Sequence, residues 1–153
     1  MARLRFACAI IALALAGSIP SAAQDKGVWS PTSNTASSIT GGLVIADAKL
    51  TVNFVSFPLA KIRPLTPAEL GAVFDADANS GPVGNLYRLS IPAARRFLHH
   101  NTLCGSEDTQ WMATYIQGKT LQVAFFSGSD EPKLTFEWLQ NSTNVCGTFT
   151  YAR

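Results

Sequence analysis

Charged residues and metal-binding residues are scarce in this chain of 153 residues. Only 14% of the residues are Asp, Glu, Lys or Arg, and the chain has two histidines and three cysteines. Lys and Arg total 12 and Asp and Glu total 10, with no run of basic residues. A nearly neutral chain without basic clusters does not have the charge distribution of a protein that binds nucleic acid or an anionic membrane surface.

Motifs for nucleophilic catalysis are also missing. Acyl transfer needs a nucleophile, a base and an orienting group, and the sequence contains no Gly-x-Ser-x-Gly elbow. Glu131 and Glu137 are six residues apart, and glycoside hydrolysis needs two carboxylates. Ten scattered carboxylates produce such pairs by chance, so a carboxylate-dependent hydrolase is only an alternative. We expect no enzymatic activity and no cofactor.

One acidic loop has part of the spacing of a calcium site. Asp75, Asp77 and Asn79 supply oxygen ligands at alternate positions, as the first half of an EF-hand loop does. The pattern then departs from the motif, because Ser80 replaces the expected glycine and Leu86 replaces the closing glutamate. These residue types are also common in turns, so we expect a loop without metal.

The two histidines, His99 and His100, are adjacent in the sequence. Adjacent side chains point in different directions and rarely bind one ion together. A weak zinc site stays open as an alternative, but we expect a polar helix end.

The first 23 residues have the three parts of a secretory signal peptide. Arg3 and Arg5 form a basic start, residues 6–17 form a short apolar segment, and residues 21–23 are Ser-Ala-Ala before the expected cut. The apolar segment is too short to span a membrane as a helix. We therefore expect residues 1–23 to be removed, and the protein to be periplasmic or secreted, with no membrane span after cleavage.

Export changes how the cysteines are interpreted. Cys104 and Cys146 remain after cleavage, and an even pair in an oxidising compartment predicts a disulfide. Closing a loop of this length stabilises the fold by roughly 4 kcal/mol if chain entropy dominates. Neither cysteine belongs to a Cys-x-x-Cys pair, which disfavours the alternative of a reactive or metal-binding thiolate pair.

Short alternating segments predict a mainly β fold. Apolar and polar residues alternate over residues 50–57, 85–91, 111–116, 121–126 and 134–139, and a last segment covers residues 148–151. We predict one antiparallel β-barrel or sandwich of seven to eight strands over residues 36–153, preceded by an extended polar arm over residues 24–35.

Within this pattern the first part of the domain is expected to be a hairpin. Residues 36–40 and 43–46 flank the turn-forming pair Gly41-Gly42. In the strand that follows, we place Leu50, Val52 and Phe54 together on the buried side.

One helix is clearly signalled. Thr66, Pro67 and Glu69 are the cap, first helical residue and third helical residue of a capping box, and apolar residues follow at helical spacing. A second short turn or helix is expected over residues 92–100, which begin with proline.

Four segments resemble a family of small exported bacterial proteins of unknown function. They are residues 35–41, 103–105, 124–128 and 146–151. The resemblance implies a bacterial exported protein in which the two cysteines recur, and it implies no activity, ligand or catalytic residue. Separately, Gly27-Val28-Trp29 matches the short Gly-x-Trp that opens lipocalins and related barrels, although a core position explains Trp29 equally well.

Aromatic residues concentrate in the second half of the chain, where both faces of the predicted sheet are partly apolar. The candidate ligand-binding residues are Trp111, Tyr115, Phe126 and Trp138. A covered core is the simpler explanation of the same pattern. We expect a non-enzymatic protein that binds a small apolar ligand or a protein partner in the cell envelope. The alternative is a structural or stress-related envelope protein without a dedicated ligand.

Overall fold

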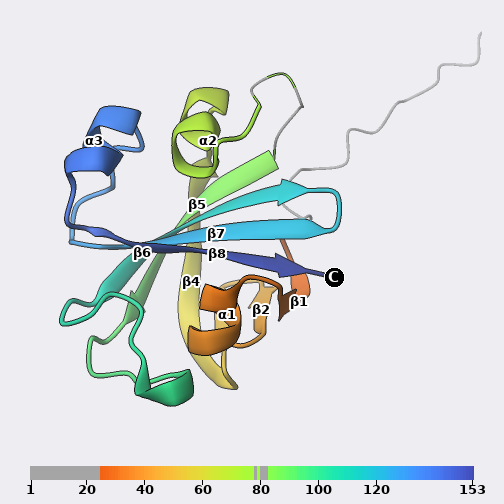
Figure 1. The fold of residues 1–153 in the computed structure, drawn as a ribbon, viewed down its shortest axis with the longest axis vertical. Coiled ribbons are helices and arrows are strands. Elements are labelled where there is room, and N and C mark those ends of the chain that lie inside the picture. The colour runs from red at the N-terminus through yellow and green to blue at the C-terminus, as the bar shows by residue number, and fades with distance from the viewer. Residues whose placement is uncertain (1–24, 78, 80–82) are drawn as a thin grey trace, which may run out of the picture.

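The structure, a computed structural model, describes residues 25–77, 79 and 83–153 (Figure 1). The predicted signal peptide lies outside the described residues. Eight antiparallel strands follow one another around a closed barrel, and the last strand pairs with the first. The strands are β1 (Gly27–Pro31), β2 (Leu43–Ala46), β3 (Lys49–Val52), β4 (Val55–Pro64), β5 (Val83–Ile91), β6 (Thr109–Gln117), β7 (Thr120–Ser127) and β8 (Val145–Ala152).

Short helices accompany the barrel. Those in the described part of the chain are α1 (Asn34–Ile39), α2 (Pro67–Phe74), α3 (Phe136–Asn141) and the 3-10 turn η2 (Leu98–His100). The prediction of a mainly β, antiparallel domain is confirmed, and the architecture is a barrel. No helix in these residues is long and apolar enough to cross a membrane.

The interior of the barrel is filled by side chains from all eight strands. Trp29 of β1, Met112 of β6, Phe125 of β7 and Tyr151 of β8 are fully buried there. The predicted alternation along β5 is confirmed, because Leu89 and its neighbours two residues away face this core. This packing places the inward positions of every strand in one apolar core.

A second core lies on the outside of the barrel, over β5, β6 and β7. The outward side chains of these strands pack against α2 and against the segment that leads into α3. The two helices contact each other on that side (Figure 1). The buried members of this outer core are Leu65, Leu70, Phe74, Leu86, Trp111, Ala113, Tyr115, Ala124, Phe126 and Leu134.

Helix α2 begins as the sequence predicted. The Thr66 hydroxyl accepts a hydrogen bond from the Glu69 amide (3.2 Å), and the Glu69 carboxylate accepts one from the Thr66 amide (2.8 Å). The capping box is therefore complete. The helix ends at Asp75, whose φ of 54° is in the left-handed region.

The predictions for residues 24–46 are partly wrong. The expected polar arm contributes strand β1, and the expected first strand of the hairpin is helix α1. Ser33 caps this helix by accepting a hydrogen bond from the Ala36 amide (3.1 Å). Small residues without strong alternation allowed a helix once a serine was available as the cap.

The predicted strand over residues 134–139 is also wrong, because these residues lead into α3. Thr135 caps the helix by accepting a hydrogen bond from the Trp138 amide (3.3 Å). Leu134 is buried and Trp138, four residues later, packs against the same outer core. A spacing of four residues satisfies a helix as well as a strand, which is why alternation alone misled the prediction.

Two further expectations are corrected. The expected helix over residues 92–100 is reduced to the single turn η2. The expected strand over residues 50–57 is two strands, β3 and β4, joined by a tight turn at Asn53 and Phe54.

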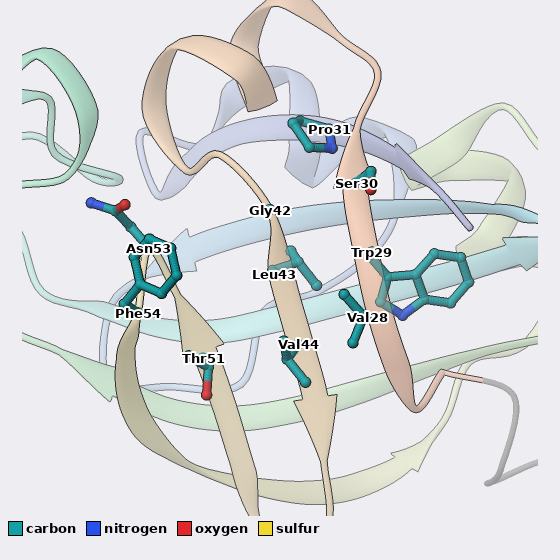
Figure 2. Close-up of a pocket in the computed structure, with 10 residues that line it drawn as sticks. All are labelled: Val28, Trp29, Ser30, Pro31, Gly42, Leu43, Val44, Thr51, Asn53 and Phe54. Carbon is teal, nitrogen blue, oxygen red and sulfur yellow. The ribbon is translucent and has the colours of Figure 1, made fainter.

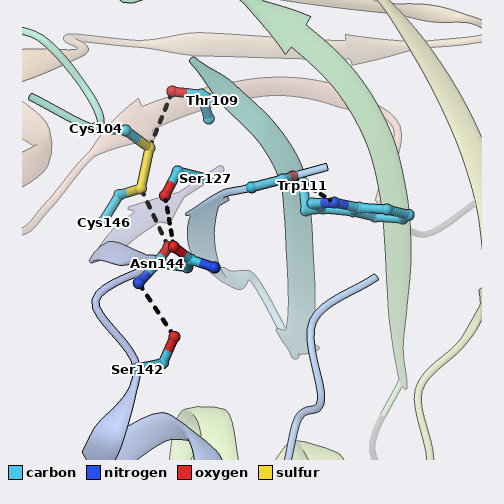
Figure 3. The surroundings of a disulfide bond; sticks show 8 residues. Cys104, Thr109, Trp111, Ser127, Ser142, Asn144 and Cys146 are labelled. Atoms are coloured by element: carbon cyan, nitrogen blue, oxygen red, sulfur yellow. Dashed lines mark hydrogen bonds between the residues drawn. A yellow bond between two sulfur atoms is a disulfide. The ribbon is translucent and has the colours of Figure 1, made fainter. Parts of the chain in front are cut away.

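The predicted disulfide between Cys104 and Cys146 is confirmed (Figure 3). It joins the connection between β5 and β6 to the start of β8. Beside it, the Thr109 hydroxyl donates to Cys104 Sγ (3.1 Å) and the Ser127 amide donates to the Asn144 carbonyl (2.9 Å). The disulfide and the bond to Asn144 fix the start of β8 against β6 and β7.

The barrel closes at a short seam between β1 and β8. Only Ser30 with Ala152 and Pro31 with Tyr151 are paired there. The Thr32 amide extends the seam by donating to the Thr150 carbonyl (2.9 Å). Beyond the seam, the Arg153 guanidinium lies over the Trp29 ring at 4.5 Å.

Candidate functional site

The outer side of β1, β2 and β3 carries the main candidate site. A groove of about 390 Å³ lies there, at the end of the barrel with the β3–β4 turn (Figure 2). Its lining residues are Val28, Trp29, Ser30, Pro31, Gly42, Leu43, Val44, Thr51, Asn53 and Phe54. None of these side chains is charged, so the groove suits an apolar or neutral polar group.

Cross-strand pairing forms the floor of the groove. Val28 of β1 is opposite Val44 of β2, which is opposite Thr51 of β3. Residues opposite each other on neighbouring strands point to the same side of the sheet. The Val28 side chain is 70% exposed. At Gly42 the backbone approaches closely, because an added Cβ would lie 3.2 Å from the Trp29 carbonyl oxygen.

Phe54 stands at the rim of this groove, at the tip of the β3–β4 hairpin (Figure 2). Val52 pairs with Val55, so Asn53 and Phe54 form a two-residue turn. Both have positive φ, 46° and 65°, as a type I′ turn requires. Asparagine tolerates this region, whereas phenylalanine there is strained. The Phe54 residue is nevertheless 98% exposed.

The sequence placed Phe54 on the buried side of a strand, and this prediction was wrong. Asn53 was the available signal, since asparagine is common at the first central position of a type I′ turn. The signal was hidden because glycine, the usual second residue of such a turn, is replaced by phenylalanine.

The four predicted ligand-binding residues lie elsewhere. Trp111, Tyr115 and Phe126 are buried in the outer core, and Trp138 packs against it. Tyr115 stacks on Phe74 of α2, with ring centroids 5.8 Å apart, and Phe126 lies 6.3 Å from Trp138 of α3. The structure thus brings these aromatics together, but against the helices of the chain.

Trp111 has two further contacts that fix it. Its indole nitrogen donates to the Gly128 carbonyl (3.1 Å), and the Arg88 guanidinium lies 4.6 Å from the ring centroid. An aromatic ring held by a hydrogen bond and a stacked cation has a structural role in this core.

The candidate calcium loop lies partly outside the described residues. Asp75 ends helix α2, and the Asp77 carboxylate accepts a hydrogen bond from the Asn79 amide (2.9 Å), as in a local turn. In the part of the chain that the structure describes, no three His, Cys, Asp or Glu side chains are grouped as metal ligands. The expectation of a loop without metal stays a prediction.

The two histidines belong to the turn η2 and its end. His99 and His100 both have positive φ, 53° and 62°. His99 Nδ1 lies 3.0 Å from the Ser38 carbonyl oxygen, so this ring is used to hold the turn against α1.

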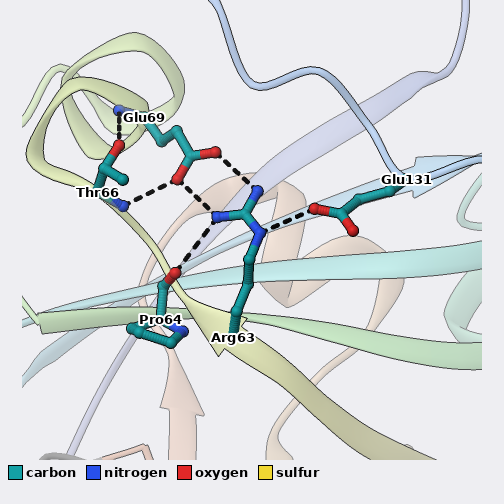
Figure 4. A network of polar contacts seen from close by, with 5 residues as sticks. All are labelled: Arg63, Pro64, Thr66, Glu69 and Glu131. Atoms are coloured by element: carbon teal, nitrogen blue, oxygen red, sulfur yellow. Dashed lines mark hydrogen bonds and ion pairs between the residues drawn. The ribbon is translucent and has the colours of Figure 1, made fainter.

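Glu131, one of the two carboxylates considered for hydrolysis, is bound in an ion-pair network (Figure 4). Arg63 of β4 contacts Glu131 at 2.8 Å and Glu69 of α2 at 2.7 Å. The hydrogen bond from Arg63 lowers the pKa of Glu69. A general acid for glycoside hydrolysis needs a raised pKa, which Glu69 lacks, and Glu131 is committed to the arginine.

A second groove of about 630 Å³ lies between α2 and the segment leading into α3. Phe136 lies at its edge and is 66% exposed. Phe136 is the first residue of a regular helix, so its exposure involves no strained backbone. The β1–β3 groove is therefore the better candidate, and Phe136 is a natural control for Phe54.

No protein-family model, curated protein or solved structure matches this chain. The resemblance to small exported bacterial proteins accordingly stays a prediction, and a functional proposal has to start from the geometry of the β1–β3 groove.

Proposed function

We propose that this is an exported, non-enzymatic binding protein, and that the β1–β3 groove docks another protein of the cell envelope. The observation that carries the proposal is Phe54, a large apolar side chain that is 98% exposed on a strained turn.

Strain and exposure both argue that Phe54 is not present for stability. A non-glycine residue in the left-handed region costs roughly 1–2 kcal/mol. The exposed ring recovers none of this by packing within the chain. Burying a phenylalanine side chain against a partner stabilises a complex by roughly 1.5–3 kcal/mol. Strained residues that persist in folded proteins cluster at functional sites.

The interior of the barrel supports a protein partner over a small apolar ligand. The inward positions are occupied by large buried side chains, among them Trp29, Phe125 and Tyr151. The aromatics first considered for ligand binding are packed beneath α2 and α3. An exposed aromatic next to an uncharged groove is instead typical of an anchor point in a protein interface.

The chemistry of the groove describes the partner. Its neutral lining favours an apolar side chain of the partner in the groove, surrounded by neutral hydrogen-bonding groups. Phe54 in turn requires an apolar pocket on the partner. The two contacts together form a reciprocal anchor, which is the arrangement that hot spots across an interface favour.

Photo-cross-linking in intact cells tests the proposal. A photoreactive phenylalanine analogue is placed at position 54, and in a matched chain at position 136. We expect one discrete protein adduct from position 54 that disappears when Val44→Asp is added. The same adducts from both positions, or adducts insensitive to Val44→Asp, would contradict the docking surface.

Binding to the identified partner then separates function from stability. Phe54→Gly should weaken the affinity at least tenfold, a loss of about 1.4 kcal/mol. The same variant should melt at an equal or higher temperature, because glycine relieves the strained turn. Phe136→Ala should leave the affinity unchanged. An unchanged affinity for Phe54→Gly would favour the alternative of a structural envelope protein without a dedicated ligand.

A further inference from the structure

A buried polar cluster lies inside the barrel, at the end where β1 begins. Asp25, two residues before β1, is fully buried. Its Oδ2 atom accepts three hydrogen bonds, from Asn85 Nδ2 (2.7 Å), the Tyr87 hydroxyl (2.8 Å) and the Thr114 hydroxyl (2.6 Å). Its backbone carbonyl accepts a fourth from the Trp29 indole (2.9 Å). The carboxylate is thus firmly held between β5 and β6.

Two acceptors in this cluster have no partner among the described residues. They are Asp25 Oδ1 and Asn85 Oδ1, and both are buried. Buried polar atoms are almost always hydrogen-bonded, and a buried charge without a counterion is strongly unfavourable. The cluster is therefore short of a donor, and that donor should carry a positive charge.

The cations nearby are engaged with other groups. Lys26, next in sequence, forms an ion pair with Asp47. Arg153 lies over the Trp29 ring and donates to the Lys26 carbonyl (3.0 Å). In the described part of the chain, no ion pair involves Asp25.

We propose that Asp25 and Asn85 bind an ammonium group, and that the chain itself supplies it as the α-amino group created by cleavage after Ala23. An ammonium carries one positive charge and three donors and needs no acceptor, which matches two unpaired oxygens beside a carboxylate. Gln24 would be the first residue of the processed chain, and consecutive Cα atoms are only about 3.8 Å apart. The proposal rests on the predicted cleavage site and is independent of the docking function.

A free ammonium ion or amine from solution is the other source of the same chemistry. A recess of about 120 Å³ reaches Tyr87 at this end of the barrel, and Lys26 and Lys61 line it. Two positive charges at the entrance oppose the entry of a free cation. A covalently attached amine avoids this barrier, so the chain terminus is the favoured source.

Cleavage would then complete the barrel. Before cleavage Gln24 has a neutral peptide N–H, and afterwards it has a cation beside the Asp25 carboxylate. Removing the leader therefore stabilises the folded domain as well as releasing it. The precursor would fold less stably than the processed chain, independently of any effect of the apolar leader itself.

Selective acetylation of the terminal amine tests the ammonium site. The processed chain is made with Gln24→Ser, so that the terminal residue does not cyclise, and is compared with its N-acetylated form. We expect acetylation to lower the melting temperature by about 5 °C at pH 7. In chains that also carry Asp25→Asn, acetylation should change it by less than about 1 °C.

The effect should also depend on pH. An α-amino group has a pKa of roughly 7.7–8.0 when unpaired, and pairing with a carboxylate raises it in the folded state. The stabilisation is then complete below about pH 7.7 and is lost as the pH rises through the raised value. The other titratable or charged groups facing this end are Lys26, Asp47, Lys61, Tyr87 and Arg153. Both chains share them, so the difference between free and acetylated chains isolates the amine.

Two further outcomes decide the source and the proposal. If ammonium chloride restores the acetylated chain, and tetramethylammonium chloride at equal ionic strength does not, the ammonium comes from solution. An equal effect of acetylation in the Asp25 and Asp25→Asn chains, with no effect of ammonium, would overturn the site. Should Asp25→Asn fail to fold, a free-versus-acetylated difference that does not change between pH 7 and pH 10 would overturn it equally.

Discussion

The outer wall of the barrel has two sides that differ in what covers them. Over β5, β6 and β7 the outward residues form a second core beneath α2 and α3. Over β1, β2 and β3 the outward residues line an open groove, with Val28 70% exposed. The inward residues of both sides belong to the same interior core. The barrel therefore uses one kind of interior and two kinds of exterior.

The outward side chains explain this difference. On the covered side they include Trp111, Tyr115 and Phe126, which are too large and apolar to remain in water. On the open side the outward row consists of Val28, Val44 and Thr51, which bury little area. Apolar area of the first size requires helices from the same chain, whereas the second leaves room for a transient partner.

The sharpest way to break the comparison is the same substitution on the two sides. Phe126→Ala removes a fully buried ring from the covered side, and we expect it to lower the free energy of unfolding by about 3–5 kcal/mol. Phe54→Ala removes an exposed ring from the open side and should change it by less than about 0.5 kcal/mol. Urea denaturation measures both, and similar losses would show that the sides do not differ as described.

The disulfide tests how the open side is held to the covered one. Cys104→Ala and Cys146→Ala should each lower the free energy of unfolding by about 2–5 kcal/mol, because the bond fixes the start of β8. The double variant should be no less stable than either single one. A urea midpoint that reductant leaves unchanged would refute a stabilising role of the bond.

The ion-pair network at the edge of the covered side should have the smallest effect. Arg63→Met removes contacts to Glu69 and Glu131 and should cost about 1 kcal/mol at pH 7, since Arg63 is partly exposed. Lys61→Met, an exposed position on the same strand, is the matched control and should cost less.

The Arg63 effect should also depend on pH. Because Arg63 lowers the pKa of Glu69 in the folded protein, the pair stabilises the protein above about pH 4.3, the ordinary value for glutamate. This stabilisation is lost as the pH falls through the lowered value. The difference between the parent chain and Arg63→Met should therefore shrink between pH 5 and pH 2. A difference that stays constant over this range would contradict the assignment to Glu69.

Much of the barrel could be predicted from the sequence where one physical rule dominated. Alternation identified β5, β6 and β7, and Thr66 with Glu69 identified the start of α2. The cysteines were correctly paired, because two of them in an exported chain leave one partner each. In these places the local pattern and the tertiary packing favour the same structure.

The remaining elements could not be predicted because two patterns coincided. In the segment before and within α3, Leu134 and Trp138 fit both alternation and helical spacing, and the helix won because Thr135 caps it. The candidate groove was missed because Phe54 occupies a turn position that normally signals itself with glycine. Which outward faces stay open depends on where α2 and α3 pack, and a single segment does not carry that information.

The seam between β1 and β8 sets the order in which the molecule can be completed. Ser33 and Thr150, which are hydrogen-bonded at the seam, are 117 residues apart. A ribosome makes β1 early, but its partner on this side exists only after nearly the whole chain has been synthesised. Until then the growing sheet has two unpaired edges, which invite pairing with other chains. Closure over such a sequence distance is slow, so the time spent as an open sheet, more than the final stability, sets the exposure of this protein to aggregation.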